Sequence, residues 1–81
     1  MASWKSVGIA IEGQPIQVNG LNPWQYEWRA ASCSDIELPH PSYPDQLHRM
    51  SVYEISSGTK TVIFAAGELS ANAWGFYVSD D

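Results

Sequence analysis

The 81-residue chain has one cysteine, few basic residues and no long hydrophobic run. Because Cys33 stands alone, no internal disulfide can form, and we expect a reducing, cytoplasmic setting. The apolar stretch 7–11 near the N-terminus is interrupted by Glu12 and Gly13. It is too short for a signal-peptide core or a membrane span, so we expect no membrane contact.

Basic side chains are scarce, with four Lys and Arg against nine Asp and Glu, giving a net charge of −5. The four basic residues are scattered along the chain. Proteins that bind phosphate backbones rely on clustered Lys and Arg, so we expect no nucleic-acid partner. An acidic surface suits solubility or the binding of a basic protein.

Recognisable catalytic and cofactor motifs are also missing. There is no glycine-rich phosphate loop and no Gly-x-Ser-x-Gly element. Residues 57–60 match a Ser-x-x-Lys pattern, but they fall in a predicted hairpin turn and not at the start of a helix. Cys33, His40 and His48 lack the close pairing typical of zinc ligands. We therefore expect neither a cofactor nor a metal site.

The chain does contain enough apolar residues for one compact core. Its length predicts a single domain over residues 1–81, with residues 79–81 as a frayed acidic tail. Hydrophobic residues make up 44% of the sequence, well above a disordered chain. A domain this small has a thin stability margin. Because association would bury further surface, we expect a homodimer.

The dominant hydrophobic period is two, which predicts an all-β fold, or a β-rich fold with at most one short helix. We expect an antiparallel meander of six to seven short strands that forms a curled sheet or a small half-open barrel. The expected elements are a hairpin over 5–19, a short extended run over 33–38, a hairpin over 50–66 with its turn at 56–59, and a last strand over 74–78 after a turn at 71–72.

The predicted strand over 60–66 is apolar on both faces, which indicates that a second layer, a barrel or a dimer partner covers each side. Gly67 and Gly75 within the strand pattern predict bulges or a bend.

Residues 24–30 fit two interpretations. Asn22 as an N-cap and Pro23 at the first helical position would start a helix. Aromatic residues at 24, 26 and 28 alternate with polar ones, which favours a strand. We favour the strand and keep the helix as the alternative.

Residues 39–48 form the candidate site. Three prolines within residues 39–44 exclude a helix interior and a central strand, so we expect a stiff, extended loop. Polar groups on such a loop lose little entropy on binding. The candidate binding residues there are His40, Tyr43, Asp45 and His48.

Glu68 and two tryptophans complete the candidate surface. Glu68 follows the strand predicted over 60–66 and is the acidic residue that we expect at the edge of a secondary-structure element. Ten aromatic rings are hard to bury in 81 residues, so we expect Trp24, Trp28 and Tyr43 to be partly exposed as binding anchors.

Three stretches carry a resemblance to a group of proteins, namely residues 38–46 (LPHPSYPDQ), 64–70 (FAAGELS) and 74–78 (WGFYV). Over residues 36–78 the chain resembles small bacterial proteins without assigned chemistry, including those carried on mobile integron gene cassettes. The resemblance implies a bacterial accessory protein that dimerises and binds a partner. It assigns no functional residue.

The sequence leaves the function unknown and favours a non-catalytic binding module, of an immunity or antitoxin-like kind, that binds a basic protein or a small molecule. The alternative is a small cavity enzyme, an isomerase or hydrolase in which His40 or His48 acts with Glu68 in acid–base catalysis. That alternative requires these side chains to lie close together in a concave pocket.

Overall fold

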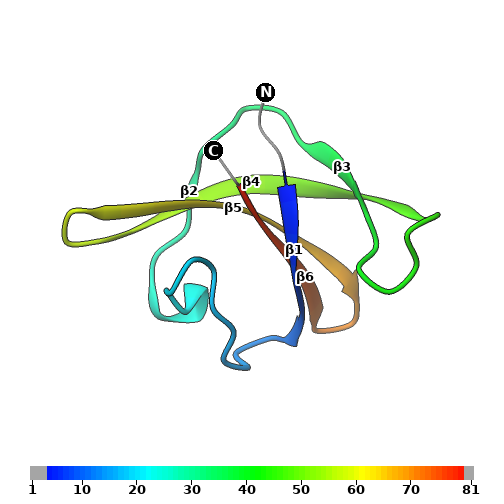
Figure 1. Ribbon diagram of the computed structural model, residues 1–81, viewed down its shortest axis with the longest axis horizontal. Helices are drawn as coiled ribbons and strands as arrows, with labels where there is room; N and C mark the ends of the chain where they lie inside the picture. The colour runs from blue at the N-terminus through cyan, green and yellow to red at the C-terminus, as the bar shows by residue number, and fades with distance from the viewer. Residues whose placement is uncertain (1–3, 80–81) are drawn as a thin grey trace.

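The structure is a computed structural model that describes residues 4–79. Six antiparallel strands form one sheet that is not closed, so the predicted all-β curled meander is confirmed (Figure 1). The strand order is β1-β6-β5-β4-β2, with β3 paired to β4. The strands are β1 (Trp4–Ile11), β2 (Arg29–Ala30), β3 (Ile36–Pro39), β4 (Leu47–Ser57), β5 (Lys60–Ser70) and β6 (Ala73–Ser79).

The β4–β5–β6 meander is the part that follows most directly from the sequence. Ser57 pairs with Lys60 around a two-residue turn, in which Gly58 takes a φ of +62°. A positive φ is favourable for glycine and matches the twist of a short hairpin. The next turn contains Asn72 at a φ of +62°, within the predicted turn at 71–72. Both predicted reversals are confirmed.

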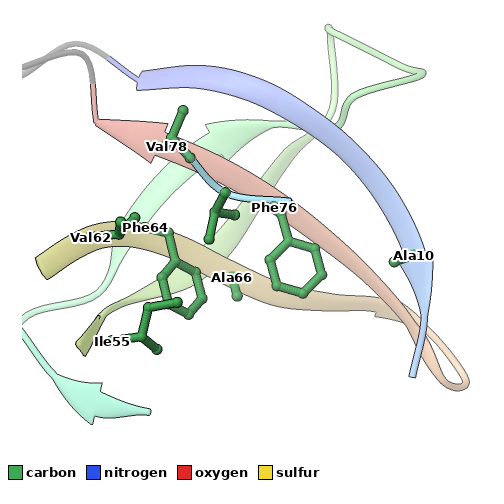
Figure 2. Close-up of a cluster of buried hydrophobic side chains, with 8 residues drawn as sticks. Ala10, Ile55, Val62, Phe64, Ala66, Phe76 and Val78 are labelled. Carbon is green, nitrogen blue, oxygen red and sulfur yellow. The ribbon is translucent and has the colours of Figure 1, made fainter. Parts of the chain in front are cut away.

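Strand β5 is buried on both faces over residues 64–67, so the cover predicted from its two-sided apolar pattern holds for that part, whereas Ile63 is exposed. Phe64 and Phe76 lie at the centre of the larger core, with Ile55 and Val62 close to Phe64 (Figure 2). The buried members of this cluster are Ala10, Val18, Ile55, Val62, Phe64, Ala66, Phe76 and Val78. The opposite face carries a smaller buried cluster of Met50, Ala65 and Tyr77.

The chain between β1 and β2 covers the larger cluster and does not form the predicted second strand. β1 pairs with β6, so the predicted hairpin over 5–19 is wrong. Val18 is fully buried and pairs only with Leu21, across a reversal at Asn19 and Gly20, both with positive φ. In this stretch the alternating apolar residues form the buried side of an irregular segment that covers the core. Such a segment has the same hydrophobic period as a strand, so the pattern does not distinguish the two.

Residues 22–30 combine parts of both interpretations. The Asn22 side chain accepts a hydrogen bond from the Trp24 amide at 3.1 Å, and a 3₁₀ helix spans Pro23–Gln25. The predicted cap is correct, but the helix ends after three residues. The favoured strand is wrong for most of the segment, because only Arg29–Ala30 pairs with β4. An alternating pattern this short cannot distinguish a paired strand from an extended segment that lies on a core.

The two glycines predicted to form bulges lie directly opposite each other as a regular pair. The pairing of β5 with β6 is irregular between Glu68 and Ser70, and the pairing of β1 with β6 is irregular between Ser6 and Gly8. A Cβ on Gly67 would lie 3.0 Å from the Arg49 carbonyl oxygen and 3.0 Å from Met50 Cγ. These glycines therefore permit a close approach by the start of β4.

The first part of β4 separates from β5 and carries the candidate site. Pairing between β4 and β5 begins at Ser51, whereas Leu47–Met50 pairs with β3. The β3–β4 hairpin thus packs on the smaller core cluster, with Met50 almost fully buried against Ala65 and Tyr77. In Figure 1 the far end of this hairpin projects beyond the rest of the sheet.

At the chain ends, Ser79 belongs to β6 and pairs with Trp4, so the predicted frayed tail does not include it. Asp80 and Asp81 lie outside the described residues. Within residues 4–79, no helix has the length and apolar character needed to cross a membrane.

Candidate functional site

The candidate site is the tip of the β3–β4 hairpin, defined here as residues 40–48. Its base is the pair Pro39 and Leu47, the last pair of the β3–β4 ladder. The amide of His40 continues the ladder by donating to the carbonyl oxygen of Gln46 at 2.8 Å. The predicted loop is therefore a compact hairpin connection and not an extended strap.

Backbone hydrogen bonds fold the tip into two successive turns. The Tyr43 amide donates to the His40 carbonyl oxygen at 3.2 Å, and the Gln46 amide donates to the Tyr43 carbonyl oxygen at 2.9 Å. The Ser42 amide donates to His40 Nδ1 at 2.9 Å. Pro41 and Pro44 have no amide hydrogen to satisfy. The tip is therefore held by its own hydrogen bonds.

Three rings pack together along the tip. The His40 ring centroid lies 4.9 Å from that of Tyr43 and 5.3 Å from that of His48. Because Nδ1 of His40 accepts the Ser42 N–H, the neutral ring carries its proton on Nε2. The structure thus brings together three of the four candidate residues of the loop.

The base of the tip is attached to the sheet by Tyr77 of β6. The Tyr77 hydroxyl donates a hydrogen bond to the Pro39 carbonyl oxygen, one residue before the tip. Burial raises the pKa of this hydroxyl, since the phenolate would be poorly solvated. Nearby, Nε2 of His48 is buried without a hydrogen-bond partner among the described residues. The tip therefore has a fixed base and an exposed outer surface.

Two large apolar side chains project from this rigid tip. Tyr43 is 58% exposed and Leu47 is 60% exposed, the two highest values among the large hydrophobic residues that the structure describes. Asp45, which lies between Tyr43 and Leu47 in the sequence, is also exposed and carries a negative charge. The prediction that Tyr43 is exposed is confirmed.

The two histidines of the tip are poorly arranged as metal ligands. Nδ1 of His40 already accepts a hydrogen bond, and Nε2 of His48 is buried. Across residues 4–79, no three His, Cys, Asp or Glu side chains come close enough together to hold a metal ion.

Glu68 lies on a different strand from the tip. It is an exposed residue of β5 that pairs with Trp74 of β6. By strand register it shares the sheet face of Phe76, whereas the hairpin packs on the opposite face with Tyr77. No contact joins Glu68 to His40 or His48 among the interactions of the described residues.

Trp24 and Trp28 also lie away from the tip. Both are half-buried, as predicted, and they pack against the larger core cluster. Their ring centroids are 5.3 Å apart, and the Trp28 ring lies edge-on to Phe64 at 5.1 Å. Trp28 Nε1 donates to the Pro23 carbonyl oxygen at 2.7 Å. These contacts give the tryptophans a packing role in the core and separate them from the other candidate residues.

Leu47 was not identified from the sequence. It lies on β4 next to the half-buried His48, so the alternation of a strand directs it outward. Extending the predicted strand from Met50 back to Leu47 would have revealed it.

The tip exposes Tyr43, Asp45 and Leu47. The described residues form no pocket around it or elsewhere. The chain matches no protein-family model, no curated protein and no solved structure.

Proposed function

We propose that this protein is a non-catalytic binding module that uses the tip of the β3–β4 hairpin to hold a protein partner. The observation that carries the proposal is the exposure of Tyr43 and Leu47 on a tip whose backbone is already hydrogen-bonded. Large apolar side chains on a pre-ordered support bind without a large ordering cost. Tyrosine in particular is enriched among the residues that dominate interface energies.

A protein partner fits this surface better than a small molecule does. Small molecules are usually held in concave sites that enclose most of their surface. Tyr43 and Leu47 instead stand out from the hairpin, as residues that insert into a hollow on a partner do.

The charge of the chain supports a basic partner. The net charge is −5, and the hairpin itself carries the exposed acids Glu37 and Asp45. Opposite charge on the partner would speed the encounter and favour the correct orientation. A bacterial accessory role of the immunity or antitoxin type, carried out in the cytoplasm against a basic protein, matches this chemistry.

The test is affinity capture from a bacterial lysate with immobilised wild-type protein and two variants. Tyr43→Ala removes the proposed anchor, and Ile63→Ala removes a side chain of comparable character, 44% exposed on β5. We expect a basic protein that is retained by wild type and by Ile63→Ala, and lost with Tyr43→Ala or at high salt. Proteins retained equally by both variants would contradict the proposal.

The cavity-enzyme alternative gains no support from the arrangement of its residues. His40 and His48 lie on the hairpin tip, and Glu68 lies on the other sheet face with no contact to them. We therefore propose a single function.

A further inference from the structure

His40 holds the first turn of the hairpin tip by its side chain as well as by its backbone. Its carbonyl oxygen accepts from the Tyr43 amide at 3.2 Å, and its Nδ1 accepts from the Ser42 amide at 2.9 Å. The backbone bond is at the upper end of the usual N–H···O range, so the bond to the ring adds to the order of the turn. This turn carries Tyr43, the exposed anchor of the proposed binding site.

The bond from the Ser42 amide requires a neutral His40 ring. A neutral imidazole has one nitrogen that accepts a hydrogen bond, whereas a protonated imidazole carries a hydrogen on both nitrogens and accepts none. Histidine is the side chain that ordinarily changes charge between about pH 5 and pH 8. Protonation of His40 therefore removes the acceptor and leaves two N–H groups facing each other.

The groups packed against His40 add to the cost of a positive charge there. From β4, the His48 ring lies 5.3 Å away between centroids, and its Nε2 is buried without a hydrogen-bond partner among the described residues. A second positive charge at this separation would repel the first. The other titratable groups nearby are the Tyr43 ring, 4.9 Å away, and the Tyr77 hydroxyl of β6, which donates to the carbonyl oxygen of Pro39.

The carboxylates of the hairpin are not placed to neutralise the ring. Glu37 and Arg49 pair across the β3–β4 ladder, and by strand alternation their side chains lie on the opposite side of the hairpin from His48. Asp45 is exposed at the end of the tip. Among residues 4–79, no carboxylate forms an ion pair with His40 or His48.

We propose that the hairpin tip is pH-sensitive, and that protonation of His40 opens the turn that carries Tyr43. The closed turn binds one proton fewer than the open one, so it is favoured at neutral pH and lost as the pH falls. Because an open tip must be ordered again on binding, it binds a partner more weakly than the closed tip does. Release of a partner in acid rests on the proposed function, whereas the opening of the turn is a property of the free protein.

The test is NMR of the free protein over the range from about pH 8 to pH 5, in which histidine titrates. We expect Nδ1 of His40 to be unprotonated at the alkaline end. As the ring gains its second proton, the Ser42 amide should exchange with water about 5-fold faster than the intrinsic pH dependence of exchange predicts, which corresponds to the loss of one hydrogen bond.

Two variants identify the group that titrates. His40→Asn supplies a side-chain oxygen that accepts from the amide two residues on and does not titrate, so the change in Ser42 exchange should disappear. His48→Leu removes the neighbouring ring and leaves the His40 bond in place, so the change should remain. A wild-type Ser42 amide without the transition, or the same transition in His40→Asn, would overturn the proposal.

Acid elution tests the consequence for binding. The immobilised chain is loaded with the basic protein captured from the lysate at about pH 7.5 and washed at about pH 5.5, on the two sides of the usual histidine transition. Relative to its own neutral value, wild type should lose more of this protein than His40→Asn does, and equal losses would overturn the release. Capture by Tyr43→Ala would instead contradict the proposed function, and the NMR result would still decide whether the turn opens.

Discussion

The hydroxyl of Tyr77 connects β6 with the base of the hairpin tip. Its aromatic ring belongs to the smaller core cluster, while its oxygen reaches the Pro39 carbonyl. The same group therefore contributes to core packing and to the position of the candidate site.

Tyr77 should make the protein sensitive to alkaline pH. Its pKa is raised in the folded state, so the neutral form is favoured by folding. The stabilisation is complete below the ordinary tyrosine pKa of about 10 and is lost as pH rises through the higher folded-state value. Thermal unfolding measured from pH 8 to pH 11 should show this loss in wild type.

Tyr77→Phe should lower the unfolding free energy at pH 7 by about 1 kcal/mol, because the Pro39 carbonyl loses its donor. It should also reduce the loss above pH 10. Tyr53→Phe, at a half-buried tyrosine, serves as the control and should keep the alkaline loss. Equal pH profiles for the two variants would contradict a role of Tyr77.

The two histidines of the tip should respond in opposite directions to replacement by leucine. Nε2 of His48 is buried without a partner, so His48→Leu should raise the unfolding free energy by about 1 kcal/mol. His40→Leu removes the acceptor of the Ser42 amide and should lower it by a similar amount. Urea denaturation at constant m-value measures both changes. A loss of stability in both variants would show that His48 Nε2 is satisfied in solution.

Among the elements, the β3–β4 hairpin depends on the absence of a side chain at Gly67. A methyl group there would lie 3.0 Å from both the Arg49 carbonyl oxygen and Met50 Cγ. Gly67→Ala should therefore destabilise the protein by about 1–3 kcal/mol through overpacking. Thr61→Ala, at an exposed position of the same strand, should change stability by less than about 0.5 kcal/mol. Chemical denaturation of both variants tests this, and equal stabilities would refute the close packing of the hairpin.

Local signals in the sequence predict the elements whose partners are near in the chain. The β4–β5–β6 meander follows from alternating residues and two short turns, with Gly58 and Asn72 at the positions that need positive φ. The pairing of β1 with β6 joins residues at opposite ends of the chain. Hydrophobic period indicates that β1 is a strand, but it does not specify the partner.

The candidate site follows the same division. His40, Tyr43 and His48 lie together because they belong to one hairpin, and their closeness in sequence is enough to predict it. Glu68 and the tryptophans are placed by tertiary contacts on the other face of the sheet. The sequence does not specify which face of the sheet carries Glu68 and the tryptophans, since the β5 segment is apolar on both sides.

For the whole molecule, the hairpin tip is the surface that we propose for a basic protein partner. Its exposed apolar side chains are Tyr43 and Leu47.

The most direct measurement of the central claim is the affinity of the captured basic protein for two purified variants, determined by isothermal titration calorimetry. Tyr43→Ala should weaken binding about 30-fold or more, as expected for an interface anchor worth about 2 kcal/mol. Ile63→Ala, at the exposed position on β5, should bind as wild type does. Wild-type affinity in Tyr43→Ala would contradict the assignment of the hairpin tip as the binding site.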